Sequence, residues 1–156
     1  MRDFIAPTQQ VLLNTPILFN SVTCQCSNRG SRIYHENGTG GFILSGGNNC
    51  PMSEGNEYQV TFNGNIAIPT GGTVGPIAVA ITVNGESRLS SRAQFTPAAV
   101  DEFGNVTSTA IIQVPKRCGC FTVSVEAVSG VDDPAATPAP SITVQNGNLT
   151  IDGTIG

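Results

Sequence analysis

The five cysteines are the residues of this chain with the most potential for covalent or metal chemistry. They form two Cys-x-Cys pairs, with one cysteine between the pairs in the sequence. In a β-strand this spacing places both sulfurs on one face, so two pairs could meet across neighbouring strands. The cluster could form disulfides, bind a soft metal ion such as zinc, or consist of reduced thiols. The sequence leaves these alternatives open for Cys24, Cys26, Cys50, Cys118 and Cys120.

The single histidine, His35, offers little for acid–base catalysis. A nucleophile–base pair would need Ser31 or Ser45 beside it and a carboxylate such as Asp101, and no motif brings them together. The chain has no Gly-x-Ser-x-Gly motif, and its glycine-rich segments lack the Lys-Ser/Thr of a phosphate-binding loop. We therefore predict no catalytic residues and no cofactor, assign no metal site, and expect no enzymatic activity.

The composition is unusually poor in charge. Only 12% of the 156 residues are charged, against about a quarter in a typical soluble domain. Asn, Gln, Ser and Thr supply the polarity instead, and Lys116 is the only lysine. Because interface cores are depleted in charge, this composition predicts a surface partly covered by copies of the chain or by a larger assembly.

The charge and hydropathy also exclude two classes of partner. The formal net charge of -4 argues against a nucleic-acid surface that works by neutralising phosphates. No apolar run approaches the roughly 18 residues that a membrane span needs. Near the start there is no long apolar segment followed by a cleavage site, so we expect no signal peptide.

The patterning favours β-strands throughout and no long helix. Residues 57–68 alternate between apolar and polar side chains, and residues 76–83 indicate a buried strand. Asn37-Gly38 and Asn84-Gly85 are strong hairpin turns. These features predict an all-β chain, a β-sandwich of eight to ten antiparallel strands. Further strands are expected within 11–19, 32–36, 41–44, 87–95, 106–114 and 121–128, and a strand pair or one bulged strand within 141–155.

Alternation along these strands selects the side chains expected to fill the sandwich. One phase of each strand should face inward and the other outward. The inward positions that we predict are Tyr58, Val60, Phe62, Ile77, Val79, Ile81, Ile111, Val123 and Val125.

The N-terminal segment is expected to stand apart from the sandwich. Residues 1–9 contain Pro7 and precede the first strand, so we predict an N-terminal arm followed by a single domain over 10–156. Within the arm, Arg2, Phe4 and Ile5 are candidate anchors to a larger particle.

The segment Gly55-Asn56-Glu57-Tyr58-Gln59-Val60-Thr61-Phe62 resembles the Gly-x-Tyr-x-Val-x-Phe strand of complement/tumour-necrosis-factor (TNF)-like jelly rolls, with one inserted residue. Two long strands, PIAVAITVNGE and NVTSTAIIQV, and a final strand follow in the same order, although the aromatic-rich ending of the complement members is missing. The resemblance implies a jelly-roll homotrimer without catalytic residues. Bacterial and bacteriophage surface proteins show the same order of segments.

We accordingly predict a non-enzymatic structural protein: a trimeric decoration or head-fibre-like protein at the virion surface of a bacteriophage. Its partner would be the major capsid protein or another particle-surface protein. One alternative is a spore-surface protein of the exosporium type, cross-linked through its cysteines. Another is a receptor- or carbohydrate-binding tip module, for which the only tyrosines are Tyr34 and Tyr58.

Overall fold

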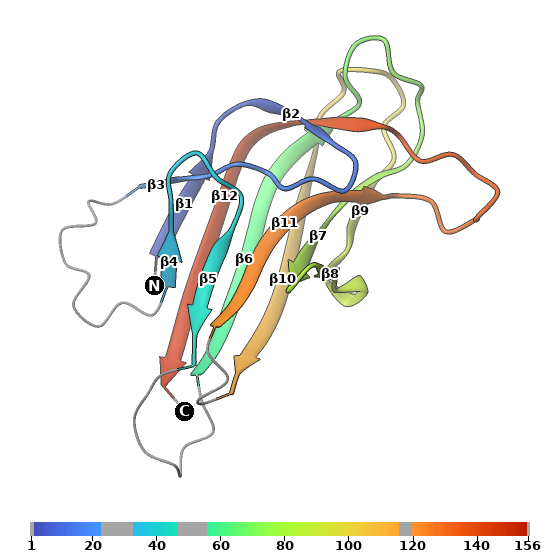
Figure 1. The fold of residues 1–156 in the computed structure, drawn as a ribbon. Helices are drawn as coiled ribbons and strands as arrows, with labels where there is room; N and C mark the ends of the chain where they lie inside the picture. The colour runs from blue at the N-terminus through green and yellow to red at the C-terminus, as the bar shows by residue number, and fades with distance from the viewer. Residues whose placement is uncertain (1, 23–32, 47–55, 116–119, 156) are drawn as a thin grey trace.

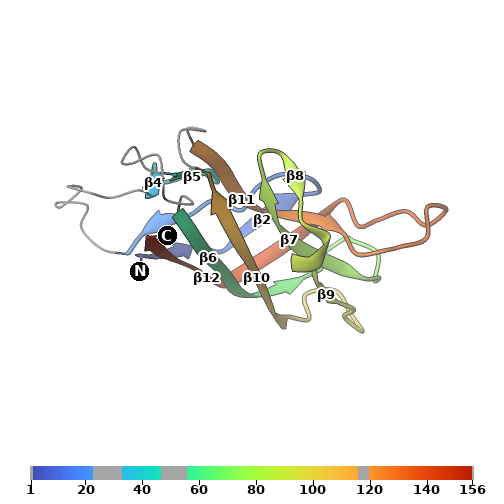
Figure 2. The ribbon, with the colours of Figure 1, turned by 90° about the horizontal axis from the view of Figure 1, so that it is seen from below.

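The computed structural model describes residues 2–22, 33–46, 56–115 and 120–155, and almost all of its regular structure is β. Two antiparallel sheets face each other, which confirms the predicted jelly-roll β-sandwich (Figures 1 and 2). Within the described ranges, no helix has the length and apolar character to cross a membrane. The strands are β1 (Arg2–Ala6), β2 (Gln9–Leu12), β3 (Asn20–Ser21), β4 (Ile33–His35), β5 (Phe42–Ser45), β6 (Asn56–Ala67), β7 (Ile77–Val83), β8 (Glu86–Ser87), β9 (Ala93–Phe95), β10 (Gly104–Val114), β11 (Cys120–Ser129) and β12 (Ser141–Ile155), with one short 3-10 helix, η1 (Leu89–Ser91).

The first sheet has the strand order β10-β6-β12-β1-β3, and β2 also pairs with β12. Its three long strands β10, β6 and β12 lie side by side in both views (Figures 1 and 2). β12 is one continuous strand with a bulge between Gln145 and Asn148, rather than a strand pair. Gly147 fits this bulge because a Cβ there would lie 2.8 Å from the Cβ of Ala6.

The second sheet has the order β4-β5-β11-β7-β8, with β9 also paired to β7. Both expected hairpins are present: β4 pairs with β5 around Asn37-Gly38, and β7 pairs with β8 around Asn84-Gly85. Asn84 and Gly85 have φ values of 51° and 86°, the positive values that a two-residue type I′ turn requires.

The short elements differ from the expected strands. Residues 11–19 do not form one strand, because β2 ends at Leu12 and Asn14 adopts a positive φ of 63°. Residues 87–95 divide into the end of β8, η1 and β9. These breaks give twelve strands within the described residues, against the eight to ten expected.

The space between the sheets is filled by one apolar core that includes β1. Its aromatic centre joins the two sheets: the Phe42 ring packs edge-on against Phe4 and Phe19, at centroid distances of 4.7 and 5.6 Å. Phe19 also meets Phe62 edge-on at 6.2 Å. All four phenylalanines are fully buried, so this cluster supplies a large share of the hydrophobic stabilisation.

The predicted free arm is wrong for residues 2–6. They form β1, which pairs with β12 from Arg2↔Ile151 to Ala6↔Gly147 and with β3 on its other edge. The cause is Phe4, whose side chain enters the core and leaves no exposed area. The segment is therefore an integral strand of the first sheet.

The predicted inward positions are buried with one exception, Ile111. It is 58% exposed, whereas the neighbouring Ile112 is fully buried. Adjacent residues of a strand point to opposite faces, so only one of the two isoleucines can enter the core. The inward phase of β10 is set by Val106, Ala110 and Val114, and Ile112 belongs to it.

The helix η1 is fastened to the second sheet through the buried side chain of Ser91. Its hydroxyl accepts a hydrogen bond from the amide of Ile81 at 2.9 Å and donates to the carbonyl of Arg88 at 2.6 Å. The Ser108 hydroxyl of β10 donates in turn to the Ser91 carbonyl. This polar chain links both sheets at one edge of the sandwich.

Replacing Ser91 by alanine should lower the free energy of unfolding by about 1–3 kcal/mol, because the buried Ile81 amide loses its partner. Denaturant unfolding measures the change. Ser90→Ala is the matched control: Ser90 is the exposed neighbour, and its loss should stay within about 0.5 kcal/mol. Equal effects of the two substitutions would contradict this role for Ser91.

Candidate functional site

The outer surface of the first sheet is the most distinctive surface of the described chain. Alternation along β6 and β10 sends one set of side chains into the core and the other set outward, and the outward set is polar except for Ile111. We call this outer surface the polar face. Its uncharged polar members are Gln59, Thr61, Asn63, Asn65, Asn105, Thr107, Thr109, Gln113, Gln145, Asn148 and Thr150.

Short amides and hydroxyls on this face bind one another across the strands. The Asn105 side-chain amide donates to the side-chain oxygens of Asn63 and Asn65 at 2.9 and 3.1 Å. The hydroxyls of Thr109 and Thr61 lie 3.5 Å apart. Because the side chains are short and mutually bonded, the face loses little side-chain entropy when it is covered.

Charge on the polar face is confined to carboxylates. Asp3, Glu57 and Asp152 point outward from β1, β6 and β12. The carboxylate of Asp3 accepts a hydrogen bond from the Thr150 hydroxyl at 3.0 Å. All five outward positions of β10, from Asn105 to Gln113, are uncharged.

Three apolar side chains interrupt the polar face. Ile111 on β10 is 58% exposed, Ile5 on β1 is 48% exposed, and Leu12 on β2 is 62% exposed. They lie on separate strands of one sheet, so they offer apolar contacts at several points of one surface. Exposed apolar groups in a surround that is poor in charge are typical of the centre of a protein–protein interface.

The cysteine cluster lies almost entirely outside the described residues. Cys24, Cys26, Cys50 and Cys118 fall in 23–32, 47–55 and 116–119. Cys120, the first residue of β11, is exposed and forms no disulfide with another described residue. Its backbone position is opposite Ser45 of β5. The alternatives of thiols, disulfides or a metal site therefore stay open.

His35 holds backbone segments together. Its Nδ1 lies 2.8 Å from the carbonyl oxygen of Gly41, its Nε2 lies 2.9 Å from that of Phe19, and its ring stacks on Phe42 at 4.1 Å. Asp101, the carboxylate considered for a catalytic arrangement with His35, instead accepts a hydrogen bond from the Thr70 hydroxyl at 2.5 Å. The described residues thus place no nucleophile–base–acid arrangement around this histidine.

The three candidate anchors have different environments. Phe4 is buried in the core, which removes it from any surface contact. The Arg2 guanidinium donates to the carbonyl of Ile33 at 2.5 Å and lies over the Phe4 ring. Only Ile5 projects from the polar face as an exposed apolar side chain. Whether Arg2 or Ile5 contacts a particle stays a prediction.

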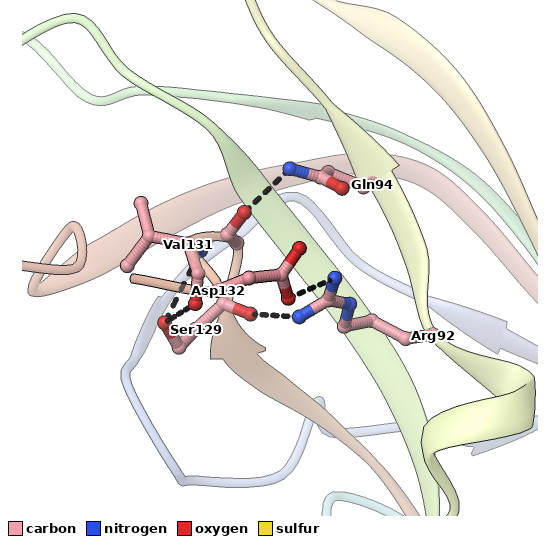
Figure 3. Close-up of polar contacts among 6 residues, drawn as sticks. Arg92, Gln94, Ser129, Val131 and Asp132 are labelled. Carbon is pink, nitrogen blue, oxygen red and sulfur yellow. Dashed lines mark hydrogen bonds and ion pairs between the residues drawn. The ribbon is translucent and has the colours of Figure 1, made fainter. Parts of the chain in front are cut away.

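A second polar cluster ties the turn after β11 to the segment that begins β9 (Figure 3). Arg92 binds the Asp132 carboxylate at 2.7 Å, and Gln94 donates to the Gly130 carbonyl at 2.5 Å. Asp132 is 80% exposed, so this ion pair contributes only about 0–1 kcal/mol. Beyond the turn, residues 131–140 project from the sandwich in both ribbon views (Figures 1 and 2). The cluster positions the base of that loop and shows no arrangement for chemistry.

Metal chemistry finds no support in the part of the chain that the structure describes. There, no three or more His, Cys, Asp or Glu side chains are grouped so that they could hold a metal ion. The low charge of the sequence predicts a covered surface, but it does not locate the polar face, because Ile111 is expected in the core. The sequence signal for the polar face is the adjacent pair Ile111-Ile112. In an alternating strand one of these two isoleucines must face outward.

Comparisons with known proteins identify the fold. No protein-family model and no curated protein matches the sequence. The solved structure of Eiger TNF from S. frugiperda is 10% identical with a TM-score of 0.60, covering 95% of this chain and 88% of that chain. Murine APRIL at pH 5.0 is 11% identical with a TM-score of 0.49, covering 95% and 97%. The globular domain of zebrafish complement 1qA protein is 16% identical with a TM-score of 0.46, covering 95% and 94%. The two-sheet topology and the similarity to Eiger TNF show that this chain has the fold of a TNF-like jelly roll.

Proposed function

We propose that this protein is a non-enzymatic structural protein that assembles as a homotrimer through the polar face. The observation that carries the proposal is the composition of that face. Strand β10 presents no charge, and neither do residues 59–65 of β6 beside it; Ile111 lies next to Gln59 in this region with more than half of its area exposed. A surface of this kind is suited to contact with other copies of the chain.

The small number of charged side chains on the polar face lowers the cost of covering it. Burying a charged side chain costs several kcal/mol unless a partner is well placed. Amides and hydroxyls that already bind one another, such as Asn105 with Asn63 and Asn65, carry part of their hydrogen bonds into the interface. The apolar side chains Ile5, Leu12 and Ile111 then supply the hydrophobic gain on association.

The number of copies follows from the TNF-like resemblance, which implies a three-fold assembly. Closed rotational symmetry is the general rule for soluble homo-oligomers, and a trimer fulfils it. Three copies would present the second sheet and the loops outward in triplicate. Weak contacts of each copy with a particle would then combine into strong attachment by avidity.

The particle that we propose is a bacteriophage capsid, with this protein as a decoration or head-fibre-like protein at the virion surface. The partner would be the major capsid protein or another surface protein. The low charge of the chain and its TNF-like fold support an assembled surface role. A spore-surface protein is the second candidate, favoured by the five cysteines; it predicts covalent ladders that collapse when reductant is added.

Hydroxyl-radical footprinting tests which face is covered. Within one copy Ile111 is 58% exposed and Leu89 of η1 is 78% exposed, so both should be oxidised in an isolated copy. In the assembled protein we expect Ile111 to be protected and Leu89 to stay reactive. Dilution that dissociates the assembly should restore oxidation of Ile111. Equal reactivity of the two residues in the assembled protein would overturn the proposed interface.

A further inference from the structure

We infer that a groove on the outer side of the second sheet is a binding site for a neutral saccharide. The groove lies along β4 and β5 and has a volume of about 420 Å³. This falls within the range of about 300–1,000 Å³ typical of small-molecule sites. The inference goes beyond the proposed assembly, because it concerns the sheet opposite the polar face.

A row of three outward side chains crosses one wall of the groove. Tyr34 on β4 is the register partner of Ile43 on β5, and Ile43 is in turn the partner of Thr122 on β11. Tyr34 is 54% exposed and Ile43 is 42% exposed. The other tyrosine, Tyr58, is buried with its hydroxyl bound to the Ser45 carbonyl. The aromatic surface of Tyr34 is thus open to a ligand and lies beside an aliphatic one.

Polar groups in the lining suit the hydroxyl groups of a sugar. Glu36 lines the groove two residues after Tyr34 and is exposed; no described residue donates a hydrogen bond to its carboxylate. A carboxylate that accepts from hydroxyl groups makes stronger hydrogen bonds than a neutral acceptor. Thr122 adds a hydroxyl that can donate or accept.

At Gly41 the groove has free space above a backbone that is held by hydrogen bonding. A Cβ on Gly41 would meet no atom within 4 Å, so this position leaves space rather than filling it. The backbone there is fixed by His35, whose Nδ1 lies 2.8 Å from the Gly41 carbonyl oxygen and whose ring stacks on Phe42. A site with a fixed backbone loses little entropy when it binds a ligand.

These features together select the ligand class. A pyranose ring has an apolar face of C–H groups that can stack on Tyr34 and Ile43, while hydroxyls at its edge reach Glu36. The lining carries one carboxylate, Glu36, and one guanidinium, Arg2, whose charge persists although it donates to the Ile33 carbonyl. The two charges offset each other, so the groove attracts neither an acidic nor a basic sugar. A neutral hexose or N-acetylhexosamine fits both the shape and the charge.

Saturation-transfer NMR with the methyl glycosides of glucose, galactose, mannose and N-acetylglucosamine tests the inference. We expect at least one of them to bind, with millimolar affinity. Tyr34→Ala should weaken that affinity by about tenfold or more, whereas Tyr34→Phe, which keeps the ring, should change it by less than about threefold. Leu89→Ala removes an exposed apolar side chain outside the groove and should leave binding unchanged.

Gly41→Val provides an independent test, since the added side chain fills the groove without a clash and should abolish binding. Thermal unfolding and native mass verify that each variant keeps its fold and assembly. The inference is overturned if none of the four glycosides binds, or if Tyr34→Ala and Gly41→Val both bind as well as the unmodified chain. Because none of these changes lies on the polar face, loss of sugar binding and loss of assembly are separate outcomes.

Discussion

Replacing Phe4 by alanine should lower the free energy of unfolding by about 3–5 kcal/mol, the usual cost of removing a large buried aromatic side chain. Phe4 leaves no exposed area, and its ring packs against Phe42 at 4.7 Å and against His35 at 5.1 Å. The loss would uncouple β1 from the core and open a cavity between the two sheets. The free energy of unfolding of a typical domain is about 5–15 kcal/mol, so the substitution would remove a large part of the stability.

Ile5→Ala is the matched control for this change. Ile5 is the next residue of the same strand, but its side chain is 48% exposed and points away from the core. At a protein concentration low enough to keep the copies dissociated, its replacement should cost less than about 1 kcal/mol in urea unfolding, because the side chain then faces water. If Phe4→Ala proved as mild as Ile5→Ala, residues 2–6 would be the separate arm that the sequence suggested, and β1 would not be an integral strand.

Replacing Ile111 by lysine should convert the proposed trimer into folded monomers. In one copy Ile111 is 58% exposed, so a lysine there can reach water and the fold should persist. In the assembly the same lysine would lose its contact with water, at a cost of several kcal/mol per copy that the nearby carboxylate of Glu57 on β6 offsets only in part. The native mass should therefore fall from about 48 kDa to that of one chain, 16.1 kDa, with an unchanged circular-dichroism spectrum.

Ile43→Lys is the control for the effect of charge alone. Ile43 is also an isoleucine within a strand and is 42% exposed, but it lies on the outer side of the second sheet. This variant should stay trimeric. A trimeric Ile111→Lys together with a dissociated Ile43→Lys would move the interface to the second sheet.

Much of the fold could be predicted because the long strands alternate cleanly. Tyr58, Val60 and Phe62 on β6 face inward as expected, since each apolar residue is separated from the next by a polar one. The hairpins at Asn37-Gly38 and Asn84-Gly85 were also predictable, because these dipeptides tolerate the positive φ that tight turns require.

The errors arise where local pattern is ambiguous. Ile111 and Ile112 are adjacent, so one of them must point outward, but the two side chains are equally apolar and do not show which one. The choice is made by Val106 and Val114 farther along the strand, which face the core together with Ile112. β1 was missed because Pro7 and the short apolar stretch before it carry no strand signal of their own. Its structure depends on long-range pairing with Asn148 to Ile151 of β12, which no local window contains.

The candidate site could be predicted only in its composition. The low charge indicated a covered surface, but its location needed the registers of β10, β6 and β12, which bring Thr107, Asn63 and Asn148 side by side. The groove at Tyr34 likewise depends on the pairing of β4 with β5 and of β5 with β11. Contacts between residues so distant in sequence follow from topology and not from spacing along the chain.

Sedimentation equilibrium of the unmodified protein in the presence of reductant tests the central claim most directly. The account predicts a mass of about 48 kDa at micromolar concentration, which corresponds to three non-covalently bound copies of 16.1 kDa. A mass of 16.1 kDa over the whole micromolar range would contradict the proposed assembly, because the polar face would then be an ordinary solvent-exposed surface.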